Sequence, residues 1–134
     1  MIVGIDPGER RVGVAVADDE TRFARPLEVV DRAATDAIGR IVEIAADVGA
    51  DVIVVGRPVG LSGRAGPAVA AQEEFVAELK ARSEIDVLEY DERFTTVVAE
   101  RAMRAAGVPA GPRRGLRDAV AAQVMLQDFL DAGR

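Results

Sequence analysis

The hydrophobic pattern changes its period after the first third of the chain, and this change restricts the fold to a few architectures. Residues 2–6, 12–17 and 23–30 read as three successive strands, the first two joined by a Pro-Gly turn. Further along, apolar residues recur at helical spacing, in alternation with two more strand-like runs, 51–56 and 85–92. The pattern predicts an α/β fold, a mixed five-stranded sheet that begins as an antiparallel meander and is completed by helical crossovers, with helices on both faces.

Capping residues delimit the expected helices. The helices are expected from Thr35 or Asp36 to Gly49, from Pro67 to about Arg82, from Thr95 or Thr96 to Gly107, and over about residues 116–132. In the third strand, Pro26 favours an edge position or a bulge. In the second strand, Gly13, Ala15 and Ala17 fall on one face, which allows a packed helix or a ligand to approach closely.

Length and composition indicate one folded domain. The 134 residues suffice for a single core, so we expect one domain over residues 1–134. Hydrophobic residues make up 49% and charged residues 30%, as in globular proteins. No apolar run approaches the roughly 20 residues of a membrane span, and no signal peptide opens the chain. We therefore expect a cytoplasmic protein with no membrane partner.

The chain contains neither cysteine nor histidine. Disulfides, thiolate nucleophiles and cysteine zinc sites are therefore excluded, together with the commonest general base. Catalysis by this chain would depend on carboxylates, hydroxyls, lysine or arginine. Hard, oxygen-ligated cations such as Mg²⁺ match that inventory.

Acidic residues stand where elements of the expected fold begin or end. Asp6 ends the first strand, Asp91 and Glu92 end the last strand, and Asp118 opens the last helix. Each has an ordinary structural explanation, since Asp6 suits a turn, a strand-end acid can simply be solvated, and Asp118 suits a helix N-cap. Together they also suit phosphodiester cleavage, in which carboxylates from separate elements surround divalent cations. The residues alone leave both interpretations open, and do not decide between Asp91 and Glu92.

Four motifs occur in order from Ile2 to about Asp131, and together they closely resemble the YqgF/RuvX family. They are "GIDPGERRVGVAVAD", "IVVGRPVGLSGRAGP", "YDERFTTVVAE" and "RDAVAAQVMLQDFLD". The resemblance implies a ribonuclease H-like fold, related to the RuvC Holliday-junction resolvase. It further implies that Asp6, Glu92 and Asp118 are the catalytic, metal-binding acids of a nuclease using Mg²⁺ or Mn²⁺. Resolvases of this fold typically carry a fourth acid where this chain has Ala121, so at most three carboxylates are expected.

The charge of the chain is unevenly distributed. The net charge is −6, but residues 93–117 contain six arginines and one acid, a net +5, which leaves −11 for the rest. Next to a phosphate-cleaving centre, these arginines are interpreted as contacts to a nucleic-acid backbone. The candidate nucleic-acid-binding residues are Arg93, Arg101, Arg104, Arg113, Arg114 and Arg117.

The resemblance implies a role in maturing the 5′ end of pre-16S ribosomal RNA. A junction-resolving DNA endonuclease on the same site is the first alternative, and a noncatalytic ribosome-assembly factor is the second. The expected partner is RNA or structured DNA, with help from a ribosomal particle because the rest of the chain is acidic. The expected oligomeric state is a monomer or a weak dimer.

Overall fold

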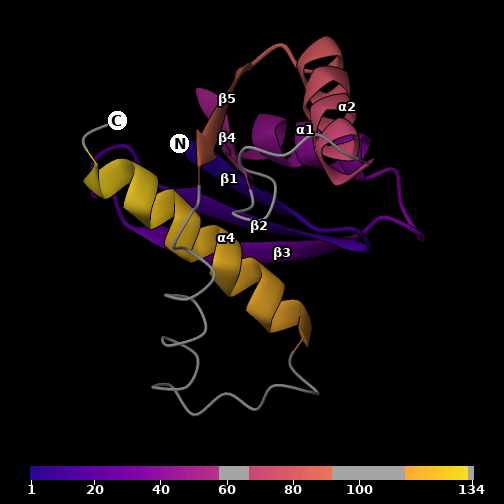
Figure 1. Ribbon diagram of the computed structural model, residues 1–134. Helices are drawn as coiled ribbons and strands as arrows, with labels where there is room; N and C mark the ends of the chain where they lie inside the picture. Colours follow the sequence, from indigo (N-terminus) through magenta and orange to yellow (C-terminus); the bar gives the residue numbers. More distant parts are fainter. Residues whose placement is uncertain (58–66, 92–113, 133–134) are drawn as a thin grey trace.

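The five expected strands form one sheet (Figure 1). A computed structural model describes residues 1–57, 67–91 and 114–132. The order across the sheet is β3-β2-β1-β4-β5, with β1, β2 and β3 antiparallel and β4 and β5 parallel to β1. The strands are β1 (Ile2–Pro7), β2 (Arg11–Ala17), β3 (Ala24–Asp31), β4 (Val52–Arg57) and β5 (Asp86–Asp91). The predicted mixed sheet is confirmed.

Helices cover both faces of this sheet, as expected. α1 (Ala37–Val48) and α2 (Pro67–Arg82) lie on one face, and α4 (Arg114–Asp131) crosses the other (Figure 1). Two hydrophobic clusters fill the two interfaces, one with Ile41 and Leu79 from α1 and α2, the other with Leu126 from α4. The sheet therefore separates two cores. The helix expected between Thr95 or Thr96 and Gly107 lies outside the described residues.

The ends of α1 follow the capping signals in the sequence. Asp36 is the N-cap, and Gly49 adopts a left-handed conformation with φ 67° just beyond the last turn. The Gly49 N–H donates to the Ala46 carbonyl at 3.2 Å, and the Ala50 N–H donates to the Ala45 carbonyl at 2.9 Å. This pair of bonds is the Schellman arrangement, in which glycine avoids the steric cost of positive φ.

The small residues of β2 allow α4 to pack close to the sheet. Ala15 and Ala17 belong to the cluster that α4 covers. A Cβ built on Gly13 would lie 2.0 Å from the Asp118 carbonyl oxygen, and one on Gly4 of β1 would lie 2.8 Å from Leu126 Cβ. Of the two explanations for this face, a packed helix or a ligand, the structure shows the helix.

The edge strand β3 is bound to α4 by a side-chain amide. Gln127 Oε1 accepts the Ala24 N–H at 2.9 Å, and its Nε2 donates to the Arg22 carbonyl at 3.0 Å. The pairing of β3 with β2 shifts register between Val14 and Ala15, beside Pro26. Pro26 therefore lies on an edge strand and beside the register shift, in agreement with the expected edge position or bulge.

Replacing Gln127 with alanine is expected to destabilise the protein by about 1–3 kcal/mol, because the backbone N–H of buried Ala24 loses its acceptor. Urea unfolding monitored by circular dichroism measures this change. Glu73→Ala, at an exposed position of α2, is the control and is expected to stay within about 0.5 kcal/mol of wild type. Equal unfolding free energies for the two variants would contradict the role of the amide.

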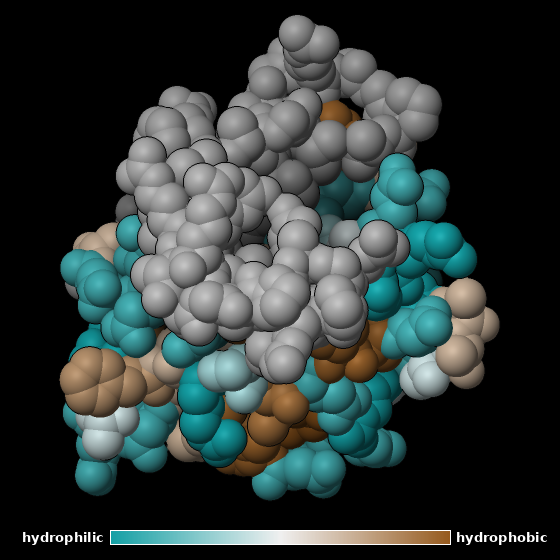
Figure 2. Space-filling view, turned by 90° about the horizontal axis from the view of Figure 1, so that it is seen from below, coloured by the Kyte–Doolittle hydropathy of each residue, from teal (hydrophilic) through white to brown (hydrophobic). Residues whose placement is uncertain are grey.

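The described surface is mostly hydrophilic on the side shown in Figure 2, with smaller hydrophobic areas between polar side chains. The large hydrophobic side chains exposed in the described part of the chain are Phe23, Leu27 and Leu88. Within the described ranges, no helix has the length and apolar character needed to cross a membrane.

Candidate active site

Asp6 lies near the carboxyl end of β1, on the side of the sheet that α4 covers. Side chains alternate along a strand, so Asp6 shares a face with Ile2 and Gly4, and both of these meet the α4 side. Asp6 is half-buried and pairs with Gly13 across the antiparallel ladder. The first strand therefore directs a carboxylate towards the helix that carries Asp118.

Asp118 lies in the second turn of α4, whereas the sequence analysis expected it to open the helix. The helix begins at Arg114, so the N-cap explanation of Asp118 is wrong. Its carbonyl oxygen lies against Gly13, the ladder partner of Asp6. The close contact that Gly13 permits thus brings Asp118 beside Asp6, although 112 positions separate them in the chain.

Arg11 is a site residue that the sequence analysis did not single out. Its Nε lies 3.3 Å from Asp118 Oδ2, and the Arg11 and Asp118 side chains are 34% and 31% exposed. Arg11 precedes Gly13 by two residues, so the period of a strand puts it on the same face as the small residues of β2. This two-residue spacing is the sequence feature that could have identified Arg11 as a site residue. It does so only when α4 is known to cross this face of the sheet.

The turn between β1 and β2 is tied down by hydrogen bonds. The Gly8 N–H donates to the Arg11 carbonyl at 2.9 Å, which closes the turn. Arg32, just after β3, donates from Nη1 to the Gly8 carbonyl at 2.7 Å, and its backbone N–H donates to the Arg10 carbonyl at 2.9 Å. These bonds fix the backbone on both sides of the point where Asp6 and Arg11 face α4.

The remaining candidate acid, Glu92, follows β5, whose carboxyl end lies at the same end of the sheet as that of β1. β1, β4 and β5 are parallel, so the carboxyl ends of all three lie at one end of the sheet. β5 ends at Asp91. Glu92, which the family resemblance favoured over Asp91, lies outside the described residues, so the described structure brings together two of the three predicted acids.

Most of the predicted nucleic-acid-binding arginines fall outside the described part of the chain. This applies to Arg93, Arg101, Arg104 and Arg113. The backbone of Arg114 and Arg117 belongs to the first turn of α4. The last helix, expected over about residues 116–132, begins at Arg114, so the basic sequence continues into the helix that carries Asp118.

Asp6 and Asp118 suit a hard divalent cation by the chemistry of their donors. Carboxylate oxygens are the ligands that Mg²⁺ and Mn²⁺ prefer, and the chain has no histidine or cysteine to favour a softer metal. Among the described residues, no group of three potential ligands lies close enough together to hold a metal. The fit of the two carboxylates thus depends on a further donor from elsewhere in the chain, on water or on substrate.

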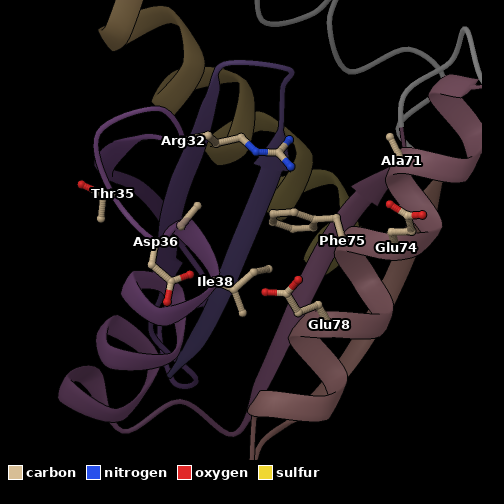
Figure 3. Close-up of a pocket in the computed structure, with 9 residues that line it drawn as sticks. Arg32, Thr35, Asp36, Ile38, Ala71, Glu74, Phe75 and Glu78 are labelled. Carbon is tan, nitrogen blue, oxygen red and sulfur yellow. The ribbon is translucent and has the colours of Figure 1, made fainter.

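A cavity of about 300 Å³ lies on the other face of the sheet, between α1 and α2 (Figure 3). Arg32 stacks over the Phe75 ring at 5.1 Å in this cavity. Asp36 and Glu78, on its wall, both pair with Arg82, at 2.5 and 3.1 Å. Arg82 lowers the pKa of the Asp36 carboxyl, so this acid is held ionised by a resident arginine. Because α1 and α2 lie on the face of the sheet opposite α4, the cavity is separate from the Asp6–Asp118 site.

The sheet order and the placement of α4 give this domain the fold of the Holliday junction resolvases. RuvC of Thermus thermophilus in complex with a Holliday junction superposes with a TM-score of 0.59 at 21% identity, over 98% of this chain and 94% of RuvC. The fowlpox virus Holliday junction resolvase gives 0.57 at 11% identity, over 98% of both chains. At such identities these structures establish the fold.

The family follows from sequence. The model of the family RuvX, described as "Holliday junction resolvase", matches residues 1–132. A relative from Nocardioides sp. is 46% identical over 98% of this chain and 88% of its own length, and one from Chloroflexus aggregans is 42% identical over 99% and 94%. Both carry the name "Putative pre-16S rRNA nuclease". The chain belongs to the RuvX family, whose members are phosphodiester hydrolases, as the sequence motifs indicated.

Proposed function

We propose that this protein is a divalent-metal-dependent nuclease that matures the 5′ end of pre-16S ribosomal RNA in the cytoplasm. The observation that carries the proposal is the packing of the Asp118 carbonyl against Gly13, the ladder partner of Asp6 near the carboxyl end of β1. The names of the relatives from Nocardioides and Chloroflexus support the RNA substrate. The match of the family model to residues 1–132 supports one domain over residues 1–134.

Asp6, Glu92 and Asp118 are the proposed ligands of Mg²⁺ or Mn²⁺. A bound divalent cation supplies the Lewis acidity that activates the attacking water and stabilises the leaving oxygen. The protein contributes a fixed arrangement, because Asp6 is held by the β1–β2 ladder and Asp118 by the contact of α4 with Gly13. One turn after Asp118, α4 carries Ala121, so a fourth carboxylate ligand is missing at that position.

The basic sequence before Asp118 is the proposed binding region for the nucleic-acid backbone. Arginine makes bidentate contacts with phosphate, and such contacts position a substrate without reading its sequence. The proposed residues are Arg93, Arg101, Arg104, Arg113, Arg114 and Arg117. Because the rest of the chain carries a net charge of −11, we propose that a precursor ribosomal particle adds to the affinity for RNA, and that the protein acts as a monomer or a weak dimer.

Cleavage assays on two substrates test this proposal. A 5′-extended 16S precursor, free or within precursor subunits, and a four-way DNA junction are each incubated with the protein in Mg²⁺, in Mn²⁺ and in EDTA. Trimming of the RNA that stops in EDTA is expected. Preferential symmetric cutting of the DNA junction would instead support the alternative, a junction resolvase, which the likeness to RuvC favours. Absence of cleavage from both substrates and from the particle would favour a noncatalytic assembly factor.

A further inference from the structure

The ion pair between Arg11 and Asp118 is anchored at both ends by backbone structure. Arg11 is the first residue of β2, where it pairs with Asp31 of β3 and its carbonyl closes the β1–β2 turn. Asp118 is fixed by the packing of its own carbonyl against Gly13. The fold therefore fixes the two backbones that carry this pair, in which Arg11 Nε lies 3.3 Å from Asp118 Oδ2.

This pairing places a permanent positive charge at the carboxylate proposed to bind a metal. Carboxylates held close together repel each other, and a nearby cation relieves that repulsion. An arginine side chain in a protein keeps its positive charge. A divalent cation that binds Asp118 needs the same oxygen atoms and also meets the charge of Arg11.

We propose that Arg11 is the resident counter-cation of Asp118, so that it stabilises the protein without bound metal and lowers its affinity for a divalent cation. This inference rests on the proposed function, because it takes Asp118 to be a metal ligand. Arg11 acts here as a positioning residue, since it holds the Asp118 carboxylate in place until a cation displaces it.

Titration of the whole protein with Mg²⁺ or Mn²⁺, followed by calorimetry in the absence of nucleic acid, tests the inference. Arg11→Met removes the charge and retains most of the aliphatic bulk, and is expected to bind the cation about two- to fivefold more tightly than wild type, the range set by a partly exposed ion pair. Arg10→Met is the matched control, because exposed Arg10 is the neighbouring residue and its loss changes the net charge equally. It is expected to bind within about 1.5-fold of wild type.

A double-mutant cycle with Asp118→Asn isolates the pair. In the Asp118→Asn background, Arg11→Met is expected to change the remaining cation affinity no more than Arg10→Met changes that of wild type. Without metal, the single Arg11→Met variant is expected to melt below Arg10→Met. Should Arg11→Met fold poorly, Arg11→Gln provides a second neutral variant with the same expectation.

Equal cation affinities for the Arg11 and Arg10 variants would overturn the inference about Arg11 but not the proposed function. Absence of saturable binding to wild type and to every variant would overturn the proposed metal site as well.

Discussion

The Asp6→Asn variant is expected to lose cleavage by about 10³-fold or more while remaining folded. Asparagine has the shape of aspartate but lacks its charge, so packing at the end of β1 is retained and the proposed metal ligand is weakened. A metal centre contributes several kcal/mol to transition-state stabilisation, and about 4 kcal/mol corresponds to 10³ in rate. Single-turnover cleavage of the preferred substrate in saturating Mg²⁺ measures the loss.

The control for Asp6→Asn is Asp47→Asn, which removes an exposed carboxylate from α1 on the other face of the sheet. It changes the net charge equally and is expected to cleave at the wild-type rate. Growth of cells that depend on the protein separates the proposed nuclease from a noncatalytic assembly factor. A binding protein keeps its biological effect in Asp6→Asn, whereas a nuclease loses it. Full cleavage by folded Asp6→Asn would exclude Asp6 from the active site.

The sequence predicted those parts of the fold that depend on local chemistry. The strand period in β2, the capping residues of α1 and the turn after Asp6 are each determined within a few residues, and the structure has them where the sequence indicated. The continuous apolar run of β4 is typical of a strand covered on both faces, and Ile53, Val54 and Val55 are all fully buried. Local signals of this kind suffice because each element has a distinct period or a distinct boundary residue.

The parts that the sequence did not predict depend on contacts between distant segments. An aspartate in the second turn of a helix and one at its N-cap look alike in sequence, so Asp118 was interpreted as opening the last helix, although α4 begins at Arg114. The role of Arg11 likewise requires the helix that crosses Gly13, which is more than 100 residues away in the chain. The residues alone offered Asp6 and Asp118 as joint metal ligands but left their ordinary structural roles equally open, and only the family resemblance favoured the metal site. Glu92 stays a prediction.

The second large effect is expected at Gly13, where alanine should both destabilise the protein and impair cleavage. The added Cβ would lie 2.0 Å from the Asp118 carbonyl oxygen, a backbone atom that moves only if α4 moves. Overpacking of a well-packed interface typically costs about 1–3 kcal/mol of stability. Only a shift of the whole helix relieves the contact at Gly13, so we expect a cost at or above the upper end of that range. We expect Tm to fall by about 10 °C.

Gly4→Ala is the matched comparison for Gly13→Ala, because both add one methyl group beneath α4. At Gly4 the new Cβ would lie 2.8 Å from Leu126 Cβ, so a smaller displacement relieves it, and a smaller loss of Tm is expected. Cleavage is measured at a temperature where circular dichroism shows both variants fully folded. Gly13→Ala should then be slower by about 10²-fold, since a shift of about 1 Å between Asp118 and Asp6 disturbs the geometry that catalysis needs. If Gly13→Ala melted and cleaved like Gly4→Ala, the close packing of α4 on β2 could not be what aligns the two acids.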